Sequence, residues 1–221
     1  MRLRQALAIV SVTVLLWPSI AAGAVTGWTN VVVRIYDANG AMPGTNQAAL
    51  DLAGRTLAAA SIDVVWKRCA NTPRAVAGAL ASQTAPGRCD APMVPGELAI
   101  RIVRSRMPEG YHGTLPLGDA LIDTRAGAGV LATIYIDRVL WLAREAHADS
   151  QALLGRAIAH ELGHLLLATS GHGPFGLMRA FWSQEEVRRG QGPDWTFAPA
   201  ELAAIRAQVT RRASTRVWGT R

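Results

Sequence analysis

Two histidines four positions apart, with a glutamate beside the first, stand in the segment "HELGH" at residues 160–164. If this segment is helical, His160 and His164 lie about 40° apart around the axis and about 6 Å apart along it, so both imidazoles can reach one ion. Glu161 projects in a different direction and need not be a ligand. The spacing therefore predicts a metal site, with Glu161 as a base that removes a proton from water.

The alternative to a metal site is an ordinary buried helix with a polar edge. The segment does have an apolar face, formed by Ile158, Leu162, Leu165 and Leu166. Two histidines and a glutamate, however, share the opposing region. Burying all three without an ion would cost several kcal/mol unless other partners were found. The sequence therefore favours metal binding.

A catalytic zinc ion usually has three protein ligands and one open position, so two histidines do not complete such a site. His172 is the favoured third ligand. A straight helix would carry it about 12 Å beyond His164, so the chain must turn back. We expect the helix to end near Ser170 or Gly171. The residues that permit a return loop are Gly171, Gly173, Pro174 and Gly176.

A downstream glutamate is the competing third ligand, and "SQEEVRRG" offers Glu185 and Glu186 on a predicted helical turn. The alternative for this pair is an exposed acidic patch facing Arg188 and Arg189. We favour His172 because imidazole binds zinc well and the surrounding turn residues fit a return loop.

The other histidines are expected to lie on the surface, His112 in a loop and His147 near a helix end. Tyr111 is a candidate for stabilising an oxyanion. Nothing in the sequence brings it near the metal, so it is left out of the predicted site.

Four strands are predicted ahead of the histidine helix, at residues 30–37, 61–68, 97–106 and 130–137. Residues 46–60 have helical composition and separate the first two strands, which gives a β-α-β unit with parallel neighbours. Residues 108–129 are expected to form a long, turn-rich loop. The strand at 130–137 is a candidate sheet edge, on which an extended substrate would pair.

Helices are predicted after the strands. Helical structure begins at 138–146, Asp149 or Ser150 caps the histidine helix, and a final helix covers 198–213. The order is β-α-β-β-β followed by helices. The fold class is therefore α+β, with a mixed sheet of about four strands, an active-site helix and a C-terminal helix.

Residues 1–24 have the three parts of a secretory signal: a basic start at Arg2 and Arg4, an apolar run, and "AGA" at 22–24. The apolar run is shorter than the roughly 20 residues that span a membrane. We expect a single domain at 25–221, exported to the periplasm or the extracellular space, with no membrane span after cleavage.

The only cysteines, Cys69 and Cys89, predict one disulfide in an exported chain. Two thiolate metal ligands are the alternative, but the pair lacks the short C-x-x-C spacing of zinc knuckles. The formal net charge is +7. No nucleic-acid-binding motif accompanies this charge, so no nucleic-acid partner is expected.

The "HELGH" segment, the later histidine and "GLM" at 176–178 together resemble the metzincin clan of zinc endopeptidases. The resemblance implies that His160, His164 and His172 bind one catalytic Zn²⁺. It also implies that Glu161 is the general base and that Met178 is the methionine of a turn beneath the metal. A zincin-like fold and a peptide or protein substrate are expected on the same basis.

The sequence departs from the clan's pattern at two positions. Leu167 stands where the pattern has glycine, three residues after the second histidine. Ser170 stands where the pattern has the third histidine, and His172 follows two residues later.

These features predict a secreted zinc-dependent endopeptidase. The alternative hypothesis is a noncatalytic exported zinc-binding protein, or an envelope binding module, with a zincin-like fold. A structural zinc site would be closed by four protein ligands and would have no need of Glu161. A metal-free binding domain would make the H-E-x-x-H pattern an accident.

Overall fold

The computed structural model describes residues 29–37, 46–69, 89, 91–105, 115–123 and 125–218. The proposed signal at residues 1–24 lies outside the described residues, as do Tyr111 and His112. What the sequence predicts for them stays a prediction. Among the described helices, none has the length and apolar character needed to cross a membrane.

The described part of the chain begins with the predicted β-α-β unit. β1 (Thr29–Asp37) and β2 (Ile62–Cys69) are parallel neighbours, and α1 (Gln47–Ala58) connects them. β1 buries alternate residues at Val31, Val33 and Ile35. α1 buries one stripe, formed by Ala49, Leu50, Ala53 and Leu57. The two periodicities place both elements on one hydrophobic core.

Three further strands complete a mixed sheet with the order β2-β1-β3-β5-β4: β3 (Leu98–Val103), β4 (Gly118–Asp123) and β5 (Ala128–Tyr135). Neighbouring strands are parallel except β4 and β5, which are antiparallel. The prediction that the strand near 130–137 forms a sheet edge is wrong, because β5 lies between β3 and β4. β2 and β4 are the edge strands.

β4 lies within residues 108–129, where the sequence predicted only a loop, so that prediction is wrong for this part. Gly118, Ala120 and Ile122 are more buried than the residues between them. The pattern is weak because the segment is short and contains glycine and aspartate, which are rare in strands. The predicted α+β fold class is confirmed, with five strands rather than about four.

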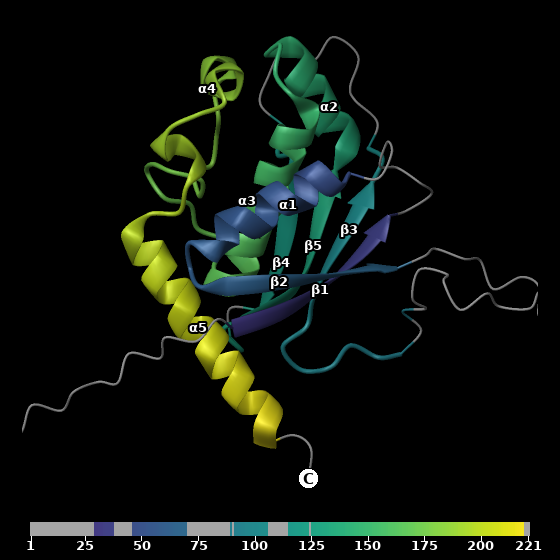
Figure 1. The fold of residues 1–221 in the computed structure, drawn as a ribbon, viewed down its shortest axis with the longest axis vertical. Helices are drawn as coiled ribbons and strands as arrows, with labels where there is room; N and C mark the ends of the chain where they lie inside the picture. The colour runs from purple at the N-terminus through teal and green to yellow at the C-terminus, as the bar shows by residue number, and fades with distance from the viewer. Residues whose placement is uncertain are drawn as a thin grey trace, which may run out of the picture.

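α2 (Ile136–Glu145) and α3 (Ser150–Leu167) follow the sheet. α3 lies beside α1 (Figure 1), and the two helices approach closely, since a Cβ atom at Gly155 would lie 2.6 Å from the Ala49 carbonyl oxygen. Every residue of α3 from Leu153 to Leu166 is buried. The polar side chains of a helix that is buried all round need hydrogen-bond or metal partners, because they cannot reach water.

α3 begins where the sequence predicts, because the Asp149 side chain accepts hydrogen bonds from the backbone of Gln151 and Ala152. It ends earlier than predicted, at Ala168 instead of Ser170 or Gly171. Ala168 adopts the left-handed conformation, with φ 54° and ψ 42°. One left-handed residue is enough to reverse the chain, and alanine can adopt this conformation at a cost of roughly 1–2 kcal/mol.

The chain then forms an irregular segment, residues 169–182, which we call the return segment. It leads to α4 (Gln184–Arg189), the short helix η2 (Pro193–Trp195) and the predicted final helix, α5 (Pro199–Trp218). In Figure 1, α4 lies at the upper left, in olive, and α5 runs from the left of the sheet to below it, in yellow. The predicted disulfide between Cys69 and Cys89 is present.

Replacing Ala168 with glycine should stabilise the protein. Glycine adopts a positive φ without the steric cost that alanine has at this position, so we expect the free energy of unfolding to rise by about 0.5–1 kcal/mol. Thermal unfolding followed by circular dichroism measures the change. Ala204→Gly, in an exposed part of α5, is the matched control and should lower stability by about 1 kcal/mol. A fall in Tm for Ala168→Gly would contradict the proposed strain.

Candidate metal centre

Three histidines from α3 and the return segment converge at one point. The candidate ligand nitrogens of His160, His164 and His172 all lie within 4.8 Å of one another. The Nε2 atoms of His160 and His164 are 3.0 Å apart. His160 and His164 are buried, whereas His172 is exposed. The chain reversal at Ala168 therefore brings together the three histidines that the sequence singled out.

The second ring nitrogen of each buried histidine faces a backbone carbonyl. His160 Nδ1 lies 2.8 Å from the Leu177 oxygen, and His164 Nδ1 lies 2.8 Å from the Thr169 oxygen. A carbonyl oxygen only accepts hydrogen bonds, so each Nδ1 carries the hydrogen and donates it. In the neutral rings both Nε2 atoms are then left with a lone pair and no proton.

Two lone pairs facing each other at 3.0 Å cannot form a hydrogen bond. A proton on one Nε2 would relieve the repulsion, but burial lowers the pKa of both rings, that of His160 to about 4. A cation between the rings relieves it at neutral pH. Two nitrogen ligands on a tetrahedral zinc ion stand about 3.3 Å apart, given Zn–N bonds of about 2.0–2.1 Å. The donor set and its spacing therefore fit zinc.

Glu161 lies beside the histidines and is only 5% exposed. Its side chain packs against the backbone of β4, since a Cβ atom at Gly118 would lie 2.7 Å from both Cγ and Oε1 of Glu161. The other oxygen, Oε2, is buried and has no hydrogen-bond partner among the described residues. An unpartnered carboxylate oxygen next to three histidines is suited to accept a proton or a hydrogen bond from a ligand.

The protonation states of Glu161 and the two buried histidines depend on whether a metal ion is bound. Burial, together with the negative charge of Asp119, raises the pKa of Glu161 to about 8. Without a metal, the carboxyl group and the two buried imidazoles are therefore mostly neutral near pH 7. A divalent cation would favour the ionised carboxylate and lower its pKa.

Met178 packs against α3 between the two buried histidines. A Cβ atom at Gly163 would lie 2.5 Å from the Met178 sulfur and 2.7 Å from the Phe197 ring. Met178 itself is 1% exposed. Gly163, the fourth residue of "HELGH", is therefore required by packing. The role of Met178 beneath a metal stays a prediction.

The competing glutamates of α4 have other partners. Glu186 pairs with Arg179, with 2.5 Å between Oε1 and Nη1, and Glu185 pairs with Arg188 at the surface. Neither glutamate belongs to the metal-ligand cluster found in the described part of the chain. His147 is exposed, has φ 50°, and is also outside that cluster. The geometry therefore favours His172 as the third ligand.

The histidines open into a cleft of about 750 Å³. Residues 115–120, which include the start of β4, form one part of its wall, and α2 and the return segment form others. Trp182 lines the cleft and packs edge-on against His160, with 5.5 Å between ring centroids. The apolar lining consists mainly of Leu115, Leu117, Trp141, Leu142, Phe181 and Trp182. A ligand much larger than a water molecule can therefore reach the histidines.

Several groups of the site were not predicted from the sequence. Gly118 was assigned to a loop, and the one available signal was a glycine at the start of a short alternating segment. The carbonyl groups of Leu177 and Thr169 have no signature at all, because any residue type supplies a carbonyl. Only the fold shows which of them faces a histidine.

In the metal-free protein, the contribution of Glu161 to stability should fall as the pH rises from about 4.5 to about 8. The unfolded chain releases the Glu161 proton near pH 4.5, whereas the folded chain keeps it until about pH 8. At this residue the unfolded state then binds fewer protons, so its contribution to the free energy of unfolding falls through this range. Glu161→Gln removes this dependence. With chelator present, we expect the Tm of this variant to exceed the wild-type Tm by more at pH 8 than at pH 5.

The control is the opposite pH effect of His160, whose folded pKa is lowered from 6.5 to about 4. At His160 the unfolded state binds the extra proton in that range, so the contribution of His160 to stability falls in both proteins as the pH falls from 6.5 towards 4. This contribution is common to the two proteins and cancels in their Tm difference. An equal Tm difference at pH 8 and pH 5 would contradict the burial of an uncompensated Glu161 carboxyl group.

Comparison with known proteins gives a likeness of fold. No family model and no curated protein matches the chain. Among solved structures, the crystal structure of archaemetzincin from Methanopyrus kandleri is similar, with a TM-score of 0.49 and 16% sequence identity. The alignment covers 83% of this chain and 96% of that chain. The likeness concerns the course of the chain alone.

Proposed function

We propose that the protein is a zinc-dependent endopeptidase that hydrolyses peptide bonds. The observation that carries the proposal is the 3.0 Å distance between the Nε2 atoms of His160 and His164, whose Nδ1 atoms each face a carbonyl oxygen. His172 lies beside them, and all three histidines line the cleft. A cation at this point would relieve the repulsion between the two atoms at neutral pH, and the cleft leaves room for a ligand.

His160, His164 and His172 would hold the zinc ion. Bound there, zinc would polarise a substrate carbonyl group and make water a nucleophile near neutral pH. The backbone carbonyls of Leu177 and Thr169 keep the two buried rings in the tautomer that exposes Nε2. Each of these hydrogen bonds from Nδ1 also fixes the direction in which its ring points.

Glu161 is the proposed general base. Its Oε2 atom is buried, lacks a described hydrogen-bond partner, and belongs to the residue next to His160. It would accept the proton of the attacking water and pass it to the nitrogen of the leaving amine. Close packing against Gly118 limits the carboxylate to a small range of positions.

The edge strand β4 is the proposed docking site for the substrate backbone. The Tyr135 N–H donates to the Leu117 carbonyl oxygen. In an antiparallel ladder, every second residue directs both its N–H and its C=O towards the neighbouring strand. Leu117 bonds to β5, so the N–H and C=O groups of Gly118 and Ala120 point away from β5. Both residues line the cleft. An extended peptide can therefore pair with them and bring one of its carbonyl groups to the histidines.

The noncatalytic alternative is a structural zinc site. Such a site needs a fourth protein ligand, but the metal-ligand cluster in the described residues contains three histidines. The buried carboxyl group of Glu161 also costs stability in the metal-free fold, and a structural site would gain nothing from it. These observations favour catalysis.

The proposal is tested with the purified mature chain. We expect about one zinc per chain by elemental analysis, and cleavage of a mixed peptide library that a chelator abolishes. Glu161→Gln should keep the zinc but lower kcat/KM by at least about 100-fold, because the general base is lost. Wild-type protein without stoichiometric zinc would overturn the proposal.

The ligand set has its own controls within this experiment. His172→Ala should lose most of the zinc, whereas Glu185→Ala should retain it, because Glu185 lies at the surface with Arg188. Zinc retained in full by His172→Ala would exclude this histidine as a ligand. A Glu161→Gln variant with wild-type kcat/KM would leave a zinc-binding protein without the proposed base.

We also propose that the protein is exported. The signal-like segment at residues 1–24 supports this, and a disulfide such as Cys69–Cys89 persists in oxidising compartments. N-terminal sequencing of the protein from the periplasm or culture medium should give Val25 as the first residue. Recovery of the intact N-terminus in the cytoplasmic fraction would contradict export.

A further inference from the structure

We propose that Arg179 is a positioning residue for the metal centre. Its ion pair with Glu186 holds the return segment in the conformation that orients His160 and presents His172. The inference rests on the proposed zinc site and extends it to residues outside the cluster.

One hydrogen bond of the return segment orients His160, and another holds the chain beside His172. The Leu177 carbonyl oxygen accepts from His160 Nδ1 at 2.8 Å, and thereby sets the tautomer of that ring. The Gly173 N–H donates to the Met178 carbonyl oxygen at 2.8 Å, and so fixes the residue that follows His172. The first contact uses the carbonyl group of Leu177 and the second that of Met178, the two residues immediately before Arg179. The placement of two of the three histidines therefore depends on the conformation of the chain at residues 177–179.

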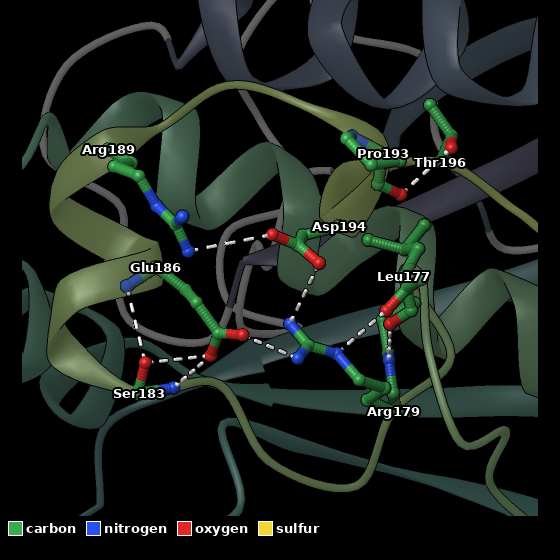
Figure 2. A network of polar contacts seen from close by, with 10 residues as sticks. Leu177, Arg179, Ser183, Glu186, Arg189, Pro193, Asp194 and Thr196 are labelled. Carbon is green, nitrogen blue, oxygen red and sulfur yellow. Dashed lines mark hydrogen bonds and ion pairs between the residues drawn. The ribbon is translucent and has the colours of Figure 1, made fainter.

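The Arg179 side chain ties this part of the chain to the elements that follow it (Figure 2). Its Nε atom donates to the Gly176 carbonyl oxygen at 3.3 Å, and its Nη1 atom lies 2.5 Å from Glu186 Oε1. Its Nη2 atom lies 3.8 Å from Asp194 Oδ1. One guanidinium group thus joins the turn before Leu177 to both α4 and η2.

Glu186 is itself held firmly. Its second oxygen accepts hydrogen bonds from the Ser183 backbone N–H at 2.7 Å and from the Ser183 hydroxyl at 2.8 Å. The pair is largely shielded from water, with Arg179 18% and Glu186 17% exposed. Hydrogen bonds from Arg179 and Ser183 lower the pKa of Glu186 to about 2, so the carboxylate is ionised at any working pH. Glu186 therefore keeps its negative charge beside Arg179 at neutral pH.

A second clamp acts on the same turn from η2. The Leu177 N–H donates to the Thr196 carbonyl oxygen at 2.8 Å, and Trp195 packs against Trp182 with 5.0 Å between ring centroids. Trp182 in turn touches His160. The ion pairs of Arg179 close this packed unit on the side of α4. Without them the turn is held by the backbone hydrogen bonds of Leu177 and Met178 and by apolar contacts.

The expected consequence is a change in metal affinity. The backbone of His160 and His164 is fixed by a buried helix, whereas the ring orientation of His160 and the position of the exposed His172 depend on the return segment. If the segment samples other conformations, the apparent dissociation constant rises in inverse proportion to the fraction of molecules that remains in the competent conformation. Loss of a hydrogen-bonded support behind a metal ligand typically weakens metal binding about 10–100-fold.

The test is a Zn²⁺ titration of the full mature chain in competition with a chromophoric chelator. We expect Arg179→Gln and Glu186→Gln each to raise the Kd for Zn²⁺ about 10–100-fold. Glu185→Gln is the matched control, since it removes an exposed ion pair from the same helix, and its Kd should stay within about twofold of wild type. The double variant should bind Zn²⁺ no more weakly than the weaker single variant, because both changes break one pair.

Each outcome decides between defined alternatives. Absence of Zn²⁺ binding by the wild type would overturn the metal centre and the positioning role together. A wild-type chain that binds one Zn²⁺, with variants of unchanged Kd, would overturn the positioning role alone, including the case in which the metal-free Tm falls. Arg179→Lys guards against a variant that fails to fold, since it keeps the charge. Its Kd should lie between those of wild type and Arg179→Gln, and a Kd no tighter than that of Arg179→Gln would contradict the ion pair.

Discussion

The tautomer imposed on His160 and His164 is the constraint on which the rest of the site depends. Two carbonyl oxygens, from Leu177 and Thr169, accept the Nδ1–H groups and leave the two Nε2 atoms bare at 3.0 Å from each other. Burial keeps the rings neutral, so a proton does not relieve the repulsion at physiological pH. Two histidines held in this way repel each other in the metal-free fold, but their Nε2 atoms are well placed to bind a metal ion.

Both carbonyl groups come from the chain just after α3, which explains why the end of that helix matters. Ala168 reverses the chain one residue before Thr169, so the carbonyl group that orients His164 lies only five residues beyond it. The same reversal returns His172 to the other two rings. The late position of this histidine relative to the metzincin pattern is therefore accommodated by a loop that begins at Ala168, where no glycine is available.

Glu161 shows how a sheet and a helix cooperate to place one carboxyl group. α3 supplies the residue, and β4 supplies a glycine whose missing side chain leaves room for it. Burial and the nearby Asp119 make the ionised form costly in the metal-free fold. A cation at the histidines would offset that cost, because it stabilises the carboxylate. In the metal-free fold the ionised Glu161 has no compensating positive charge, and a cation at the histidines would provide one.

The sequence by itself determined the histidine helix, its start at Asp149 or Ser150, the candidate third histidine, the disulfide and the α+β class, because local periodicity and ligand spacing depend on residue types. That Asp149 is the cap is decided by the structure. The sequence did not determine that β4 is a sheet edge, since strand order depends on contacts between distant segments and β4 carries little β-branched character. Nor did it reveal the carbonyls of Leu177 and Thr169, the place of Gly118, or the pairing of Glu186 with Arg179. These are backbone positions and long-range contacts, and only the tertiary structure decides which of them meet.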